Sequence, residues 1–258
     1  MPRIIAIANQ KGGVGKTTTA VNLAACLAAA GKKTLLIDID PQANATSGLG
    51  IEKNNIEKSV YDLLINSIAP TELIIKTIIP LLDLIPSNDQ LNGAQIELVD
   101  VDRREYLFRE KINPLRDVYD YILIDTPPSL GLLTVDALVA ADKILVPLQC
   151  EYYALEGFAK LLATIDLVKT SLNPELSFLG IVLTMYDGRT NLAAQVADDV
   201  KKHFSSQVFN TVIPRSIRLS EAPGFGKPII IYDFRSSGAE AYIKLTQEVI
   251  EREETRVG

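Results

Sequence analysis

The chain has 258 residues, of which 47% are hydrophobic and 22% are charged, and this composition excludes a largely disordered protein. Its formal net charge of -6 excludes a uniformly basic coat for nucleic acid, so any DNA contact must come from a local patch. Neither a signal-peptide pattern nor an apolar run long enough to cross a bilayer occurs in the sequence, so we expect a cytoplasmic protein without a membrane partner.

Short apolar runs alternate along the chain with segments of helical pattern. The segment 17–30 is rich in alanine and free of glycine and proline, which favours a helix, and Gly31 ends it. Apolar runs typical of strands occupy residues 3–8, 33–39, 121–124, 143–147 and 179–185. Because such runs are typical of strands buried on both faces, we expect an α/β fold, with a doubly wound, mostly parallel β-sheet and helices on both faces.

The stretch 48–113 is less regular than the rest of the chain. It predicts helices around 59–65 and 71–78 and a strand at 82–86, with no linker rich in Gly, Pro or Ser and no internal repeat. We therefore expect a single domain that spans residues 1–258. Ligands bind such sheets at the carboxyl ends of the strands, which is where Gln10, Asp40, Asp125 and Gln149 fall.

A glycine-rich loop joins the first predicted strand to the first predicted helix. It reads Lys11-Gly12-Gly13-Val14-Gly15-Lys16-Thr17-Thr18. Glycines let backbone N–H groups turn onto phosphate oxygens, and the helix that follows points its positive end at the same anion. Lys16 can then reach the β- and γ-phosphates, and the Thr17 hydroxyl can bind Mg²⁺. The loop predicts a P-loop site for ATP and Mg²⁺.

The spacing departs from the usual P-loop, because Gln10 stands where the first glycine is expected and Lys11 follows it. The loop resembles the deviant phosphate loop of the family that includes ParA/Soj, MinD, nitrogenase iron protein and the arsenite-pump ATPases. In that family the extra lysine, here Lys11, reaches across a dimer interface to the partner's nucleotide, and Gly12 lies where the two backbones approach closely. The alternative is that Lys11 is a solvated loop lysine.

Three aspartates follow predicted strands. Asp125 is placed to order the water around Mg²⁺ and the Thr17 hydroxyl. Asp38 and Asp40 are two residues apart, so they point the same way if the strand continues to Asp40. The resemblance implies that Asp40 orients or activates the attacking water and that Asp38 lies near the metal. A second interpretation of Asp38, as a cap on the turn that Pro41 forces, stays open.

The segment 213–228 is rich in turn residues and resembles the family's adenine loop. The resemblance implies that Pro214 and Ser216 contact the base through backbone groups, and an ordinary surface loop is the alternative. In ParA/Soj proteins, basic residues late in the chain grip the phosphates of DNA without sequence preference. Arg189 and Arg218 are the leading candidates here, with solvated surface charges as the alternative for each.

The resemblance covers nearly the whole chain and is greatest to the chromosomal ParA/Soj type. Cys26 and Cys150 do not have the placement of iron–sulfur ligands, and the basic amphipathic helix of MinD is missing. The resemblance implies a slow, partner-stimulated ATPase that forms a homodimer with ATP and binds non-specific double-stranded DNA on the nucleoid. It would partition a chromosome or plasmid with a ParB/Spo0J-type protein. The alternatives are a MinD-like protein-positioning ATPase, a metabolic P-loop enzyme, and a binding module without hydrolysis.

The expected site residues form four sets. The catalytic set is Lys11, Lys16 and Asp40. The nucleotide set is Lys11, Gly12, Gly13, Val14, Gly15, Lys16, Thr17, Thr18, Pro214 and Ser216. The metal set is Thr17, Asp38 and Asp125, and the DNA set is Arg189 and Arg218.

Overall fold

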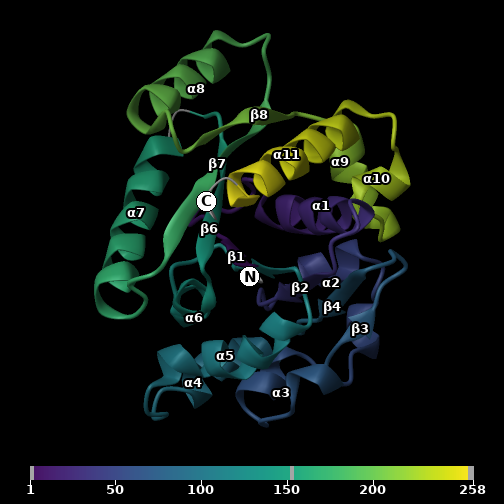
Figure 1. Cartoon of the computed structure of the whole chain (residues 1–258), viewed down its shortest axis with the longest axis vertical. Coiled ribbons are helices and arrows are strands. Elements are labelled where there is room, and N and C mark those ends of the chain that lie inside the picture. Colours follow the sequence, from purple (N-terminus) through teal and green to yellow (C-terminus); the bar gives the residue numbers. More distant parts are fainter. Residues whose placement is uncertain (1–2, 152–153, 255–258) are drawn as a thin grey trace.

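The structure is a computed structural model that describes residues 3–151 and 154–254 (Figure 1). An eight-stranded sheet runs through it in the order β3-β4-β2-β5-β1-β6-β7-β8. The strands are β1 (Arg3–Ile7), β2 (Thr34–Asp38), β3 (Ile75–Lys76), β4 (Leu82–Ile85), β5 (Tyr121–Asp125), β6 (Lys143–Gln149), β7 (Ser177–Tyr186) and β8 (Val208–Pro214). The β3–β4 pair is antiparallel and the other pairs are parallel. The predicted α/β fold with a mostly parallel sheet is confirmed.

Helices cover both faces of the sheet (Figure 1). One face carries α1 (Lys16–Ala29), α2 (Asn44–Gly48), α9 (Ile217–Glu221), α10 (Ile229–Tyr232) and α11 (Ser237–Glu254). The other face carries α3 (Val60–Leu64), α4 (Leu91–Glu97), α5 (Arg104–Ile112), α6 (Leu132–Ala140), α7 (Ala154–Ser171) and α8 (Asn191–Phe204). Short 3₁₀ turns are η1 (Lys53–Asn55), η2 (Pro70–Glu72), η3 (Asn113–Asp117) and η4 (Ala222–Phe225).

The two faces of the sheet form two hydrophobic cores. Successive side chains of a strand point to opposite faces, so Ile4 and Ala6 of β1 belong to the core on the side of α6, whereas Ile5 and Ile7 belong to the core on the side of α1. Because both sets must be apolar, the central strands are continuous apolar runs, which is why the sequence alone locates them.

Two parts of the fold differ from the sequence-based expectation. The predicted helix at 71–78 is wrong, because η2 and the edge strand β3 occupy this stretch, and β3 pairs with β4. The strand β8 was not expected at all, because Asn210 and Thr211 interrupt its apolar run. Their backbone N–H groups donate to the two carboxylate oxygens of Glu248 on α11, at 2.8 and 3.0 Å. A side chain thus replaces a neighbouring strand along this part of the edge.

Cys26 and Cys150 are free and buried. In the part of the chain that the structure describes, no helix combines the length and the apolar character that crossing a membrane requires.

Asp136 is a buried carboxylate in the apolar helix α6. It is 1% exposed, and neither oxygen has a hydrogen-bond partner among the described residues. Burial and the neighbouring Glu105 carboxylate raise its pKa from 3.8 to about 8, against the opposing effect of Arg104. The folded protein therefore holds a proton on Asp136 that the unfolded chain releases above about pH 4. The resulting cost to folding is absent in acid and grows as the pH rises toward 8.

We expect Asp136→Asn to stabilise the protein at neutral pH but not in acid. Between pH 5 and pH 7 the advantage of the variant in free energy of unfolding should grow by about 3 kcal/mol, since one pH unit in this range corresponds to about 1.4 kcal/mol. Urea unfolding at the two pH values measures it. Asp83 is the matched control, because this buried aspartate is paired with Tyr119 and Lys76, so Asp83→Asn should destabilise. An advantage of Asp136→Asn that does not change with pH would contradict the assignment.

Candidate functional site

The loop between β1 and α1 leaves the start of α1 open to an anion. Gly13 and Gly15 have φ angles of 73° and 88°, in the left-handed region that glycine adopts without strain. Gly15 is the N-cap of α1 and supplies no side chain to the free N–H groups of the first turn. These N–H groups and the positive end of the helix are therefore available to phosphate.

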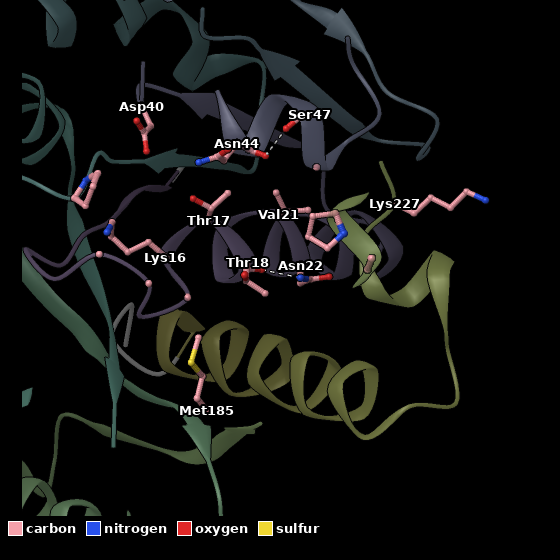
Figure 2. A pocket seen from close by; sticks show the side chains of 17 residues that line it. Lys16, Thr17, Thr18, Val21, Asn22, Asp40, Asn44, Ser47, Met185 and Lys227 are labelled. Atoms are coloured by element: carbon pink, nitrogen blue, oxygen red, sulfur yellow. Dashed lines mark hydrogen bonds between the residues drawn. The ribbon is translucent and has the colours of Figure 1, made fainter. Parts of the chain in front are cut away.

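A pocket of about 380 Å³ lies against this loop (Figure 2). The loop residues that line it are Gly12, Gly13, Gly15, Lys16, Thr17 and Thr18. Asp40 lines the pocket from the segment after β2, and the Lys16 amine lies at the same end of the pocket (Figure 2). Lys227 lies at the opposite end. The structure thus brings Lys16, Thr17 and Asp40 together around one cavity.

The other two residues of the predicted loop, Lys11 and Val14, do not line this pocket. Val14 is buried, and its carbonyl accepts a hydrogen bond of 2.8 Å from the Thr184 hydroxyl at the end of β7. Lys11 forms an ion pair with Glu151, with 2.8 Å between Nζ and Oε2. Val14 therefore anchors the loop to the sheet, and the Lys11 ammonium is held outside the cavity.

Lys16 is the buried cation of the site. It is 6% exposed, and its ammonium donates to the Lys11 carbonyl at 3.3 Å. Burial lowers its pKa, and the nearby Asp125 and Asp40 carboxylates oppose this effect. A phosphate group beside Lys16 would favour its charged form further.

Asp38 and Asp125 are register partners at the carboxyl ends of the adjacent strands β2 and β5. Both are fully buried. Burial and the Asp38 charge raise the pKa of Asp125 well above its usual range, while Thr17 and Lys16 lower it in part. Neither Asp125 oxygen has a hydrogen-bond partner of normal geometry among the described residues. Buried carboxylate oxygens that lack a partner suit the water shell of a divalent cation.

The condition under which Asp38 and Asp40 would point the same way is not met, because β2 ends at Asp38 and the chain then turns. Asp38 accepts hydrogen bonds from the Asp40 N–H at 3.1 Å, the Thr46 N–H at 2.8 Å and the Thr46 hydroxyl at 2.7 Å. These are the contacts of a turn cap, the second of the two interpretations that the sequence left open. Asp40, in contrast, is directed to the pocket.

A second cavity, of about 350 Å³, adjoins the first and shares Gly15, Thr18, Met185 and Pro223 with it. Pro214 and Ser216 line this cavity. Pro214 is the last residue of β8, and Ser216 is the N-cap of α9. The segment expected to contact the base thus borders a cavity that is continuous with the phosphate loop.

Sequence reasoning assigned no role to several pocket residues. These are Val21, Asn22, Asn44, Ser47, Gly48, Pro128 and Met185, whereas Ala222, Pro223 and Lys227 belong to the segment 213–228 that was compared with the adenine loop. Asn22 carried a signal, since it is an amide among the alanine, valine and leucine residues that follow Thr19 in this helix and lies six positions after Lys16. Met185 carried no such signal. Its backbone has a φ angle of 50°, which the residue type methionine does not indicate.

Asn22 connects the phosphate loop helix to the far wall of the pocket. Its Nδ2 donates to the Thr18 carbonyl at 2.7 Å (Figure 2), and its Oδ1 accepts from the Ile229 N–H at 2.6 Å. It is 4% exposed, so removing its amide leaves the buried Ile229 N–H without this partner, whereas the Thr18 carbonyl keeps its helical hydrogen bond.

We expect Asn22→Leu to lower ATP affinity by about tenfold, because an unpaired buried N–H group costs about 1–3 kcal/mol and the segment at Ile229 is no longer bonded to α1. Isothermal titration with ATP measures the effect. Asn173→Leu is the matched control, since Asn173 is equally buried and donates to the carbonyls of Leu138, Val139 and Ala141. It should lose stability but keep its ATP affinity. Equal loss of ATP affinity in both variants would contradict the tether.

The two arginines of the DNA set lie outside the pocket. They follow β7 and β8, the two strands at the edge of the sheet opposite β3. β7 and β8 end as a register pair at Tyr186 and Pro214, and Arg189 and Arg218 follow within a few residues. Arg189 is 88% exposed and forms a bidentate ion pair with Asp187. Arg218 is 56% exposed and contacts Glu221 and Asp233. Each therefore carries an acidic partner of its own chain.

Known proteins are similar to this chain over nearly its full length. The family model described as an AAA domain matches residues 2–178. The sporulation initiation inhibitor protein Soj of Bacillus subtilis is 57% identical over 249 residues, which cover 96% of this chain and 98% of Soj. The chain belongs to the ParA/Soj family of chromosome-partitioning ATPases. The family assignment made from the phosphate loop is confirmed.

Other ParA/Soj relatives and a solved structure extend the comparison. The chromosome partitioning protein ParA of Myxococcus xanthus is 55% identical over 251 residues, which cover 97% of this chain and 89% of that protein. A crystal structure named cobyrinic acid a,c-diamide synthase, from Mycobacterium smegmatis with ADP and magnesium bound, has a TM-score of 0.88 and 35% identity. It covers 99% of this chain and 97% of its own. This chain thus shares its fold with a structure crystallised with ADP and magnesium.

Proposed function

We propose that this ParA/Soj-family ATPase is a switch that dimerises on ATP, binds DNA without sequence preference as the dimer, and releases it after hydrolysis. It would act as one domain, cytoplasmic and nucleoid-associated, in chromosome or plasmid partitioning with a ParB/Spo0J-type partner. The observation that carries this proposal is the position of Lys11. Its ammonium lies outside its own subunit's pocket although its backbone belongs to the phosphate loop, so it could contact a nucleotide on a second copy once it leaves Glu151.

Gly12 supports the same proposal. A Cβ on Gly12 would lie 3.7 Å from Pro128, an ordinary van der Waals contact, and the backbone at Gly12 is not left-handed. The subunit itself therefore does not require glycine here. Close approach of a second backbone would require it, and in that case a side chain at position 12 blocks dimerisation but not folding.

The hydrolytic step follows from the groups around the pocket. Lys16 and the free N–H groups of α1 bind the phosphates, and Asp40 orients or activates the attacking water. Thr17 and Asp125 would hold Mg²⁺, directly and through water, with Asp38 supporting the turn that carries Asp40. The bound ion would neutralise the charge that develops on the phosphates. Pro214 and Ser216 would contact the base from the adjoining cavity.

DNA binding would use the edge of the sheet where β7 and β8 end. Arg189 and Arg218 would exchange their intrachain carboxylates for phosphate oxygens. Both pairs are exposed, and exposed pairs are weak, so this exchange requires little free energy. In a dimer each arginine occurs twice, which doubles the number of phosphates neutralised.

We expect Arg218→Glu to weaken DNA binding by the ATP dimer at least tenfold and to reduce the slope of log K against log salt by about 2, since each neutralised phosphate contributes about 0.9. Fluorescence anisotropy with random-sequence duplex at several salt concentrations measures both. Lys58→Glu is the control, because Lys58 is similarly exposed. It precedes α3, which lies between β2 and β3 in the chain and not next to β8. An unchanged slope in Arg218→Glu would remove this arginine from the DNA surface.

A biosynthetic P-loop enzyme is the second candidate, because the solved structure with a TM-score of 0.88 is named as a synthase. Such an enzyme would turn over ATP steadily only with its small-molecule substrate, and DNA would not change the rate. ATP turnover that depends on DNA and on protein concentration would exclude it, because a dimer-gated switch alone shows both dependences.

A further inference from the structure

The ammonium of Lys11 is already engaged in its own subunit. Its Nζ lies 2.8 Å from Oε2 of Glu151, which follows the end of β6. The other carboxylate oxygen of Glu151 accepts a hydrogen bond from Gln149, the last residue of β6. Both oxygens of Glu151 are thus occupied, and one of them holds Lys11.

The backbone of Lys11 is fixed independently of this ion pair. Its N–H donates to the Asn9 side chain at 3.1 Å, and the Asn9 amide donates to the Pro147 carbonyl of β6 at 2.7 Å. Asn9 therefore ties the start of the phosphate loop to β6 and sets Lys11 beside Glu151. Loss of Glu151 would free the Lys11 side chain but leave the loop in place.

We propose that Glu151 is a positioning residue that holds Lys11 in its own subunit and so sets the threshold for dimerisation. The inference rests on the proposed role of Lys11 at a second subunit's nucleotide. In the separate chain the ammonium pairs with Glu151, and in the dimer it exchanges this carboxylate for phosphate. Gln149 orients Glu151 for the first of these states.

The Lys11–Glu151 ion pair is weak enough to raise the dissociation constant of the dimer without preventing dimerisation. The side chains of Lys11 and Glu151 are 35% and 47% exposed. An exposed ion pair of this kind changes an equilibrium constant by a factor of about 1.4 to 5. A symmetric dimer releases two such pairs, so the factors multiply. Removal of Glu151 should therefore lower the dissociation constant of the dimer about 2- to 30-fold.

The first test compares Glu151→Gln with the parent chain, both carrying Asp40→Ala to prevent hydrolysis. The dissociation constant of the ATP-bound dimer, measured by sedimentation velocity over a protein dilution series, should fall by the factor given above. Glu72→Gln is the matched control, because it removes the same charge from the similarly exposed Lys58–Glu72 pair, and it should leave the constant unchanged. An unchanged or higher constant in Glu151→Gln would overturn the proposal.

The second test reads the ion pair directly, in the dilute chain without nucleotide. The rate at which acetic anhydride modifies the Lys11 amine, followed by mass spectrometry, should rise up to about fivefold in Glu151→Gln and stay unchanged in Glu72→Gln. A tighter dimer without faster modification would mean that Glu151 acts only as a repelling charge. The proposal that Glu151 holds Lys11 would then be wrong. If the parent chain does not dimerise with ATP, the proposed function fails, while the modification rate still decides whether Glu151 holds Lys11.

Discussion

Asp40→Asn should bind ATP with near-normal affinity and hydrolyse it about 10²- to 10⁴-fold more slowly, the usual contribution of a group that accepts or orients a proton in the reaction. The reason is its position. Asp40 lies at the Lys16 end of the pocket and is directed into it (Figure 2), whereas Asp38 is turned into the loop. Single-turnover hydrolysis of radiolabelled ATP measures the rate, and equilibrium titration measures the affinity.

The choice of asparagine separates chemistry from structure. An Asp40 oxygen also accepts the Gln42 N–H at 3.0 Å, and the asparagine carbonyl can keep this contact. Asp38→Asn is the comparison, since its carboxylate serves the Asp40 and Thr46 N–H groups. It should reduce stability as well as activity. A hydrolysis rate within a few-fold of the parent in Asp40→Asn would show that the water is activated elsewhere.

Lys11→Ala is expected to retain ATP binding and to lose the ATP-dependent dimer. Each lysine–phosphate contact is a hydrogen bond between charged groups, worth about 1.5–3 kcal/mol, and a symmetric dimer contains at least two. The dissociation constant of the dimer should therefore rise about 10²- to 10⁴-fold. Light scattering after size exclusion, with saturating ATP, measures it.

Lys58→Ala provides the control for this variant, because it removes an exposed lysine paired with a glutamate outside the phosphate loop. Its dimer should match the parent. A normal dimer in Lys11→Ala would mean that Lys11 is a solvated loop lysine. It would contradict both the proposed contact of Lys11 with the second subunit's nucleotide and the proposed role of Glu151 in dimerisation.

The central strands and the phosphate loop were predictable because local sequence determines them. The parallel strands must be apolar on both faces, and the loop needs glycines at positions such as Gly13 and Gly15, where the backbone is left-handed. The edge strands were not predictable, because local sequence does not determine them. β3 is two residues long, and β8 depends on Glu248 from a distant helix for two of its N–H contacts.

The site was predictable where residue type alone sets the chemistry. Lys16, Thr17 and Asp40 meet at one pocket as expected. The direction of Asp38 was not predictable, because it depends on where β2 ends and on Thr46 eight residues later. Asn22 and Glu151 could not be found either. Asn22 acts through Ile229, and Glu151 through Lys11, and both pairs are far apart in the sequence.

The most direct test of the ATP-gated switch is sedimentation of the Asp40→Ala variant with ATP, with ADP and without nucleotide, each with and without random-sequence duplex DNA. We expect a monomer without nucleotide and with ADP, a dimer with ATP, and co-sedimentation with DNA for the ATP dimer alone, weakening as salt rises. A monomer under all these conditions, or DNA binding that is equal with ATP and ADP, would contradict the account.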